Sequence, residues 1–160
     1  RSTPDARRAT MTPIAALHKL PLAAAIRESA WAFPLLEIVH IAAFAAMIGT
    51  VLTVEMRTLG LQRAIPLLEL GRLGVKIALV AFAVIVLSGS LLLLSDLEGY
   101  IANRAFVVKL GLITLAAINM VVFHLRNSLA RPDAIARAQA VLSLTLWLGV
   151  ISAGRLIAYI

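Results

Sequence analysis

Four continuous apolar stretches constrain this chain more than any other feature of its sequence. They cover residues 31–54, 74–94, 105–123 and 138–160. Each is long enough to cross a bilayer, which takes roughly 20 residues at a rise of 1.5 Å per residue. Because the stretches are continuous rather than alternating, they favour membrane helices over membrane strands. We therefore expect an all-α fold, a bundle of four transmembrane helices.

Composition supports a membrane location and narrows the possible chemistry. The 160 residues are 61% hydrophobic and 14% charged, whereas a soluble domain has about 25% charged residues. The absence of Cys excludes disulfides, thiol nucleophiles and cysteine metal sites. The net charge is +7, with the basic residues mainly in loops between apolar stretches. Anionic lipid headgroups are therefore the expected partner of these residues, and nucleic acid is not.

The segment before the first span predicts a separate element at the membrane surface. Pro13 and Pro21 each stand where a helix can begin, and apolar residues are interspersed with polar ones such as Lys19 and Arg27. This pattern indicates an amphipathic helix in the headgroup region. We expect a disordered tail over residues 1–12, an interfacial segment over 13–30 and the transmembrane domain over 31–160.

Basic residues also predict the orientation in the membrane. Short loops rich in Lys and Arg stay in the cytoplasm. The loops after the first and third spans carry most of the basic residues close to the membrane, namely Arg57, Arg63, Arg72, Lys76, Arg126, Arg131 and Arg137. Both termini are therefore expected outside. Arg57 and the neighbouring Glu55 mark the inner end of the first span, where headgroup contact explains both.

Ionisable residues inside the spans mark a candidate site, because charge in the hydrocarbon core is costly. Counted from Trp31, Glu37 lies roughly 9 Å deep and His40 roughly 13 Å deep, on one helical face. Lys109 and Arg155 fall in the same half of the membrane, so a cluster is expected. In a structural interpretation, Glu37 and Arg155 form an ion pair that fixes helix register. In a functional one, His40 binds a metal or cofactor and the other three side chains support it.

A haem b held by two histidines is one form of the functional interpretation. Both imidazoles must then lie at nearly the same depth. Counted from Ala105, His124 lies about 28 Å deep, against about 13 Å for His40. A haem that bridges these two is disfavoured. A haem or copper ion at His40 with a weaker second ligand, or with His18 folded inward, stays open, and His124 is a separate cofactor-binding candidate.

Small residues spaced four apart predict close helix packing. Ala45 and Gly49 in the first span, with Gly149 and Ala153 in the fourth, would let these two helices approach. Motifs of hydrolases, nucleotide-binding proteins and metalloproteases are missing from the sequence, so we lean away from an enzyme.

Several short motifs resemble a known family. They are the Ile26–Ser29 and Trp31–Glu37 stretches followed by His40, Met56–Leu61, Asn103 with Phe106 and Lys109, Asn119, His124, Ser143–Trp147 and Gly154–Tyr159. Over about residues 20–159 the chain resembles a family of uncharacterised bacterial four-helix membrane proteins, a domain of unknown function. Members carry an acidic residue directly before Arg-Leu-Leu-Gly-Leu, whereas here Met56 separates Glu55 from Arg57.

A more distant resemblance concerns His40 alone. A histidine in the first span, then small residues and an Arg, is similar to bacterial copper-resistance D proteins and haem-binding protoporphyrinogen oxidases, which implies haem or copper at His40.

Two functions follow as hypotheses for a chain expected in a bacterial inner membrane. The first is a non-enzymatic subunit or anchor of a larger membrane complex, such as a redox complex, which packs against other membrane proteins or itself. The alternative is a haem b- or copper-binding electron-transfer protein that uses His40.

Overall fold

The computed structural model describes residues 20–159, and this part of the chain is helical, with no strand. Its helices are α2 (Pro21–Glu28), α3 (Ala32–Thr58), α4 (Leu67–Ser95), α5 (Leu97–Ala102), α6 (Arg104–Leu125) and α7 (Ala134–Leu156). Four of them, α3, α4, α6 and α7, are long and apolar enough to cross a membrane. The expectation of an all-α fold with four membrane helices is confirmed.

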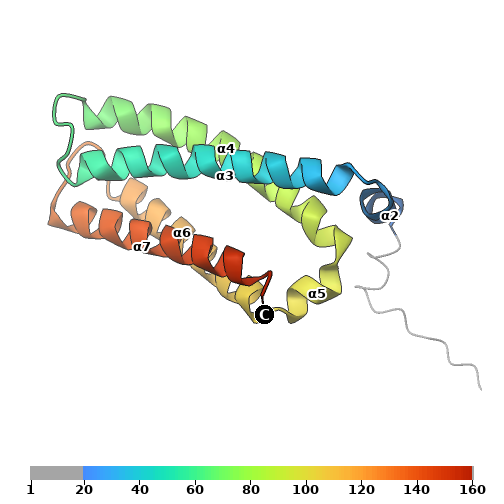
Figure 1. Ribbon diagram of the computed structural model, residues 1–160. Helices are drawn as coiled ribbons and strands as arrows, with labels where there is room; N and C mark the ends of the chain where they lie inside the picture. Colours follow the sequence, from blue (N-terminus) through green and yellow to red (C-terminus); the bar gives the residue numbers. More distant parts are fainter. Residues whose placement is uncertain (1–19, 160) are drawn as a thin grey trace, which may run out of the picture.

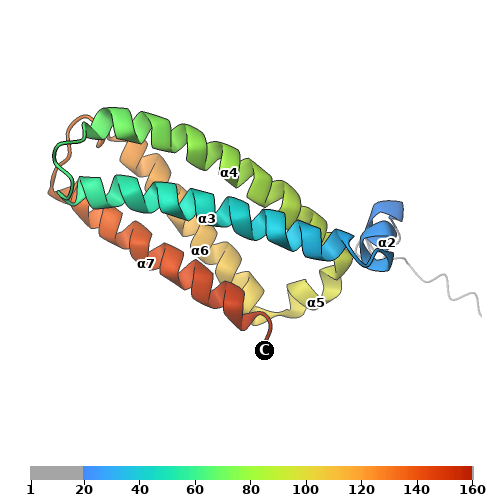
Figure 2. The same cartoon turned by 45° about the horizontal axis from the view of Figure 1, so that its top comes forward.

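The long helices form two antiparallel pairs, α3 with α4 and α6 with α7 (Figure 1). Helix α3 also packs against α7, and these contacts join the pairs. Over the described residues, α4 and α6 do not pack against each other. The loops 59–66 and 126–133 share one end of the bundle, which we call the loop end. Helices α2 and α5 and the end of α7 lie at the other, the terminal end (Figure 2).

The helices extend beyond the apolar stretches that predicted them. Helix α3 continues to Thr58, and α4 already begins at Leu67 behind Pro66. Helix α7 begins behind Asp133, whose side chain accepts from the Ala136 N–H over 2.7 Å. Apolar length measures the membrane core, whereas proline and capping residues set where a helix ends. Helix α2 begins at Pro21 inside the predicted interfacial segment, and residues 1–19 lie outside the described residues, the predicted tail and His18 among them.

A short helix, α5, lies in the connection between the second and third membrane helices. Asp96 caps it, because its Oδ1 accepts from the Gly99 N–H over 3.1 Å. Tyr100 of α5 packs on Phe106 of α6, with ring centroids 5.5 Å apart. Burial raises the pKa of Tyr100, and the carboxylates of Glu37 and Asp96 raise it further. These contacts tie the connection between α4 and α6 to the terminal end of the bundle.

Small residues allow close approach within the pairs rather than between α3 and α7. A Cβ at Gly74 of α4 would lie 2.8 Å from Val54 Cγ2 of α3, and one at Gly149 of α7 would lie 3.1 Å from Leu112 Cδ1 of α6. Nothing lies within 4 Å of such a Cβ at Gly49. The predicted α3–α7 role is therefore wrong for Gly49 and Gly149, because α7 turns Gly149 toward α6.

Two asparagines add hydrogen bonds between α6 and α7. The Asn119 Nδ2 donates to the Gln139 carbonyl oxygen over 3.0 Å, and the Asn103 Nδ2 donates to the Ile157 carbonyl oxygen over 3.1 Å. Such bonds hold membrane helices together where the hydrophobic effect does not.

Candidate functional site

His40 lies half-buried on α3 in the terminal half of the bundle, against α4. Its Nδ1 is 2.9 Å from Ser88 Oγ, and Gly89 lets the ring approach so closely that a Cβ there would lie 3.0 Å from His40 Cε1. The one proton of the Ser88 hydroxyl is directed at the Val84 carbonyl oxygen, 2.7 Å away. His40 Nδ1 must therefore be the donor. In neutral His40 the lone pair is then on Nε2, the nitrogen available to a ligand.

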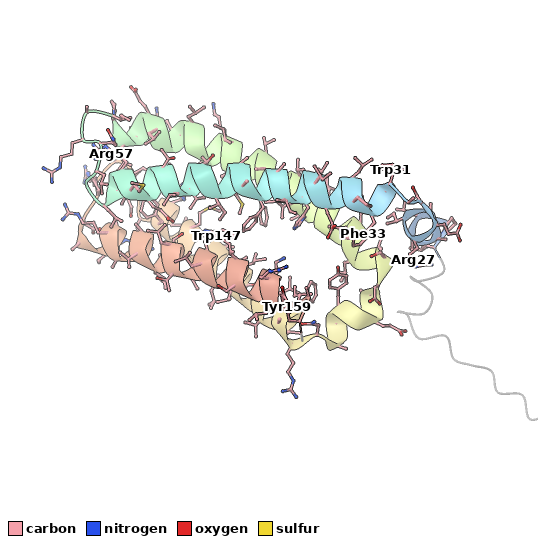
Figure 3. All side chains as sticks on the ribbon, in the orientation of Figure 1. Arg27, Trp31, Phe33, Arg57, Trp147 and Tyr159 are labelled. Atoms are coloured by element: carbon pink, nitrogen blue, oxygen red, sulfur yellow. The ribbon has the colours of Figure 1, made fainter. Side chains whose placement is uncertain are left out.

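The other three predicted members of the cluster lie apart from one another. Lys109 extends along Gly154 of α7, where a Cβ would lie 3.7 Å from its Nζ, and it is the charged group that acts on the His40 ring. Arg155 donates to the hydroxyl of Tyr159, which follows the end of α7, and lies 4.8 Å from the centre of that ring. Figure 3 shows Tyr159 at the terminal end of α7.

Glu37 is exposed, and its carboxylate acts electrostatically on Tyr100 of α5. Within residues 20–159 no hydrogen bond or ion pair joins any two of Glu37, His40, Lys109 and Arg155. The ion pair between Glu37 and Arg155 is therefore not formed. His40 and Lys109 are the two members that the fold brings near each other.

His124 lies at the other end of the bundle from His40. Its Nδ1 donates to the Met120 carbonyl oxygen over 2.8 Å, which again leaves Nε2 with the lone pair. His124 shares a cavity wall with Glu55. Fifteen residues of α3 separate His40 from Glu55, a rise of about 22 Å. In the described residues, no three His, Asp or Glu side chains come within reach of one metal ion.

A cavity of about 200 Å³ lies between the four long helices in the loop half. Its wall is mostly apolar, and all four helices contribute to it. Leu79 of α4 and Met120 of α6 line it while being 54% and 41% exposed, so it opens between α4 and α6, where the bundle is not closed. An opening on this side faces the lipid. The polar side chains of its wall, apart from the indole of Trp147, are Thr50, Glu55, Thr58, Asn119, His124, Gln139 and Ser143.

The cavity wall is more polar near the loop end and more apolar toward the middle of the bundle, as a bilayer leaflet is from its headgroups to its acyl chains. On α3, Glu55 lies near the loop end and Met47 lies about 12 Å deeper by helical rise. On α7, Gln139 and Trp147 are related in the same way. Trp147 packs edge-on against Phe44 of α3, with centroids 6.0 Å apart, and Figure 3 shows it on the side of α7 that faces α3. Most of the polar groups gather toward the loop end, and the deeper wall is apolar except for Thr50, whose hydroxyl donates to the Ala46 carbonyl oxygen of its own helix.

Glu55 is the site residue that sequence reasoning missed. We expected ordinary headgroup contact for it, but it is only 8% exposed and lines the cavity. The Ser143 hydroxyl of α7 interacts with its carboxyl group, yet Glu55 Oε2 has no hydrogen-bond partner within the described residues. Gln139 Oε1 is likewise buried without a partner. A buried polar atom without a partner costs about 1–3 kcal/mol, so these two oxygens mark where a further group would bind.

The sequence contained a signal for Glu55. Met47, Val51 and Glu55 are spaced four apart, so they share a helical face with His40 and Phe44. That face points into the bundle, so the Glu55 side chain also points inward.

The chain matches no model of a protein family, no curated protein and no solved structure.

Proposed function

We propose that this protein is a non-enzymatic accessory subunit that holds an amphiphile from the surrounding bilayer in its four-helix cavity. One observation carries the proposal: an apolar cavity that opens to the lipid side between α4 and α6, with its polar groups gathered at headgroup depth. Ligand sites in proteins are mostly apolar concavities with a few convergent polar groups. The amphiphile's chain would lie along Met47 and Trp147, and its head group near Glu55.

As a subunit of a larger membrane complex, the protein would present the bound amphiphile to its partner proteins. The open side between α4 and α6 is where the amphiphile would pass, and where other membrane proteins or a second copy would contact it. In keeping with the family resemblance, we place the protein in a bacterial inner membrane. The basic loop end is cytoplasmic in this proposal, because basic loops are retained there.

The test is whether the purified protein holds an amphiphile and loses it when the cavity is filled. Ala78 of α4 lines the cavity, whereas Ala83 is an exposed alanine of the same helix outside it. Native mass spectrometry of the protein released from lipid nanodiscs should show a bound amphiphile in the wild type and in Ala83→Leu. Ala78→Leu should lose most of it. Equal occupancy in all three proteins, or none in the wild type, would contradict the proposal.

His40 supports a second candidate function, the binding of haem b or copper. The observation that favours it is the fixed tautomer, because an Nδ1–H held by a protein acceptor is the usual way to orient a histidine ligand. His40 Nε2 would bind the metal, and Lys109 would be the nearby cation for a haem propionate. A bound haem or copper ion would supply one-electron chemistry.

Visible absorption spectra of the purified protein, oxidised and then reduced with dithionite, test this candidate together with metal analysis. A Soret band or stoichiometric copper that disappears in His40→Ala and persists in His124→Ala would support it. A cofactor unchanged by His40→Ala would rule His40 out as its ligand.

A further inference from the structure

Within the part of the chain that the structure describes, the carboxyl group of Glu55 is buried without a cation or a full set of hydrogen-bond donors around it. Glu55 lies three residues before the end of α3, at the polar end of the cavity. Its Oε2 points at no donor within the described residues, and the Ser143 hydroxyl is its one described hydrogen-bonding neighbour. A buried carboxylate is stable when a cation and hydrogen-bond donors compensate it.

The cavity wall does not supply that cation from Lys or Arg. Of the described residues that line it, none is Lys or Arg, and His124 is the other titratable group. His124 Nδ1 already donates to the Met120 carbonyl oxygen of its own helix, and within the described residues no hydrogen bond joins His124 to Glu55 Oε2. The basic residues of the nearby loops engage other groups: Arg126 pairs with Asp133 over 2.7 Å, and Arg57 donates to the Ile65 carbonyl oxygen over 2.6 Å.

Unpartnered acceptors dominate the polar end. Glu55 Oε2 and Gln139 Oε1 are both buried oxygens without a donor, contributed by α3 and α7. Asn119 has one N–H committed to the Gln139 carbonyl oxygen. A head group that brings N–H donors and a positive charge would satisfy both oxygens and compensate the carboxylate.

We infer that the cavity selects a cationic amphiphile, an alkylammonium with an N–H head group, and that Glu55 is its counter-ion. The inference rests on the proposed function and specifies the ligand that the cavity holds. The ammonium would lie between Glu55 and Gln139, and the alkyl chain would run toward Trp147 and leave between Leu79 and Met120. Trp31, the other tryptophan, is exposed at the terminal end of α3 and far from this cavity.

The position of Trp147 in the wall provides the assay. In the Trp31→Phe protein, Trp147 is the one remaining tryptophan, and a bromine atom on an alkyl chain quenches indole fluorescence on contact. The protein is reconstituted in phosphatidylcholine bilayers and titrated with three probes of the same brominated chain: a primary amine, an alcohol and a carboxylic acid. The reciprocal protein, Trp147→Phe, retains Trp31 and reports quenching by simple partition into the bilayer.

The expected result is saturable quenching of Trp147 by the amine at a concentration at least tenfold below that of the alcohol, and no saturable quenching by the acid. Glu55→Gln should abolish the tenfold preference and leave amine and alcohol alike. Glu69→Gln, which removes an exposed carboxylate from the first turn of α4 at the same end of the bundle, should leave it unchanged. Should Glu55→Gln not fold, Glu55→Asp keeps the charge and should retain the order of the three probes.

The possible failures separate the inference from the proposed function. Equal saturable quenching by amine and alcohol in the wild type would overturn the inference, and so would preference for the acid or a preference that survives in Glu55→Gln. The cavity would still bind an amphiphile in the first two cases. If no probe quenches Trp147 saturably, and Ala78→Leu behaves as the wild type, both the inference and the proposed function fail.

Discussion

His40 of α3 donates from Nδ1 to Ser88 Oγ of α4 across 2.9 Å, and the Ser88 hydroxyl donates in turn to the Val84 carbonyl oxygen. The direction of the first bond is fixed by the second, because a hydroxyl has one proton to give. The chain of two bonds joins the α3–α4 pair and fixes which ring nitrogen faces outward. The Ile85 carbonyl oxygen, also of α4, is a second acceptor near the His40 ring.

Replacement of Ser88 by Ala should release this tautomer. Neutral His40 in the wild type should have its proton on Nδ1, which nitrogen NMR of labelled histidine distinguishes from a proton on Nε2. In Ser88→Ala the Nδ1 acceptor is lost, and the population should shift toward the Nε2–H form that free imidazole side chains prefer. Ser90→Ala, an exposed serine of the same helix, is the control and should leave the spectrum unchanged. An Nε2–H form in the wild type would refute the assignment.

Gly74 should be intolerant of a side chain, because α3 and α4 are closest there. The Cβ of Gly74→Ala would lie 2.8 Å from Val54 Cγ2 and 3.3 Å from Thr50 Cγ2, so the helices must separate. Overpacking of this kind costs about 1–3 kcal/mol. We expect a loss of that size in the free energy of unfolding, measured by steric trapping in bicelles.

Gly111 provides the matched control. A Cβ there meets no atom within 4 Å, so Gly111→Ala should leave stability unchanged or raise it by up to about 1 kcal/mol through helix propensity. Equal losses in the two variants would show that α3 and α4 do not depend on the contact at Gly74.

Apolar length predicted the four membrane helices, because a bilayer demands about the same span from every sequence. It did not predict the helix ends or α5, which depend on the fixed backbone of Pro66 and on the capping hydrogen bonds of Asp133 and Asp96. Depth along a helix was also predictable, since it needs only the rise per residue.

The candidate site was predicted less well, because depth does not give the direction in which a side chain points. Glu37 and Arg155 have compatible depths, but Glu37 is exposed and acts on Tyr100 of α5, and Arg155 contacts Tyr159 just beyond the end of its helix. The spacing from Val51 to Glu55 indicates that the two share the helical face that points into the bundle. The position of Glu55 at the end of the span instead favoured headgroup contact. How far α4 stands from α6, and hence the cavity itself, depends on packing that no local pattern contains.

Asn103 should stabilise the terminal end of the bundle through both of its polar atoms. Its Oδ1 accepts from the N–H groups of Ala105 and Phe106, and its Nδ2 donates to the Ile157 carbonyl oxygen of α7. Asn103→Ala loses an N-cap and an interhelical bond, each worth about 1 kcal/mol, so unfolding should cost about 2 kcal/mol less. Asn103→Asp keeps the cap and should lose about half as much. If both variants lost equal stability in the same unfolding assay, the cap would contribute nothing.

Asp133 should make the stability of the loop end depend on pH. The Ala136 N–H, and after it the Arg126 guanidinium, lower the pKa of the Asp133 carboxyl group. Its folded pKa therefore lies below the unfolded value of about 3.9, so the stabilisation is fully present above that value and is lost as pH falls through the folded pKa. Asp133→Asn keeps a capping oxygen but no charge, and at neutral pH it should melt slightly below the wild type. The effect should be small, because the pair with Arg126 is exposed and screened by salt.

Thermal melts across the acid range should show the melting temperatures of the wild type and of Asp133→Asn converging as the wild-type carboxylate protonates. Arg126→Gln should shrink the gap between them at neutral pH, and a gap that is constant down to the lowest pH would mean that charge at Asp133 plays no part.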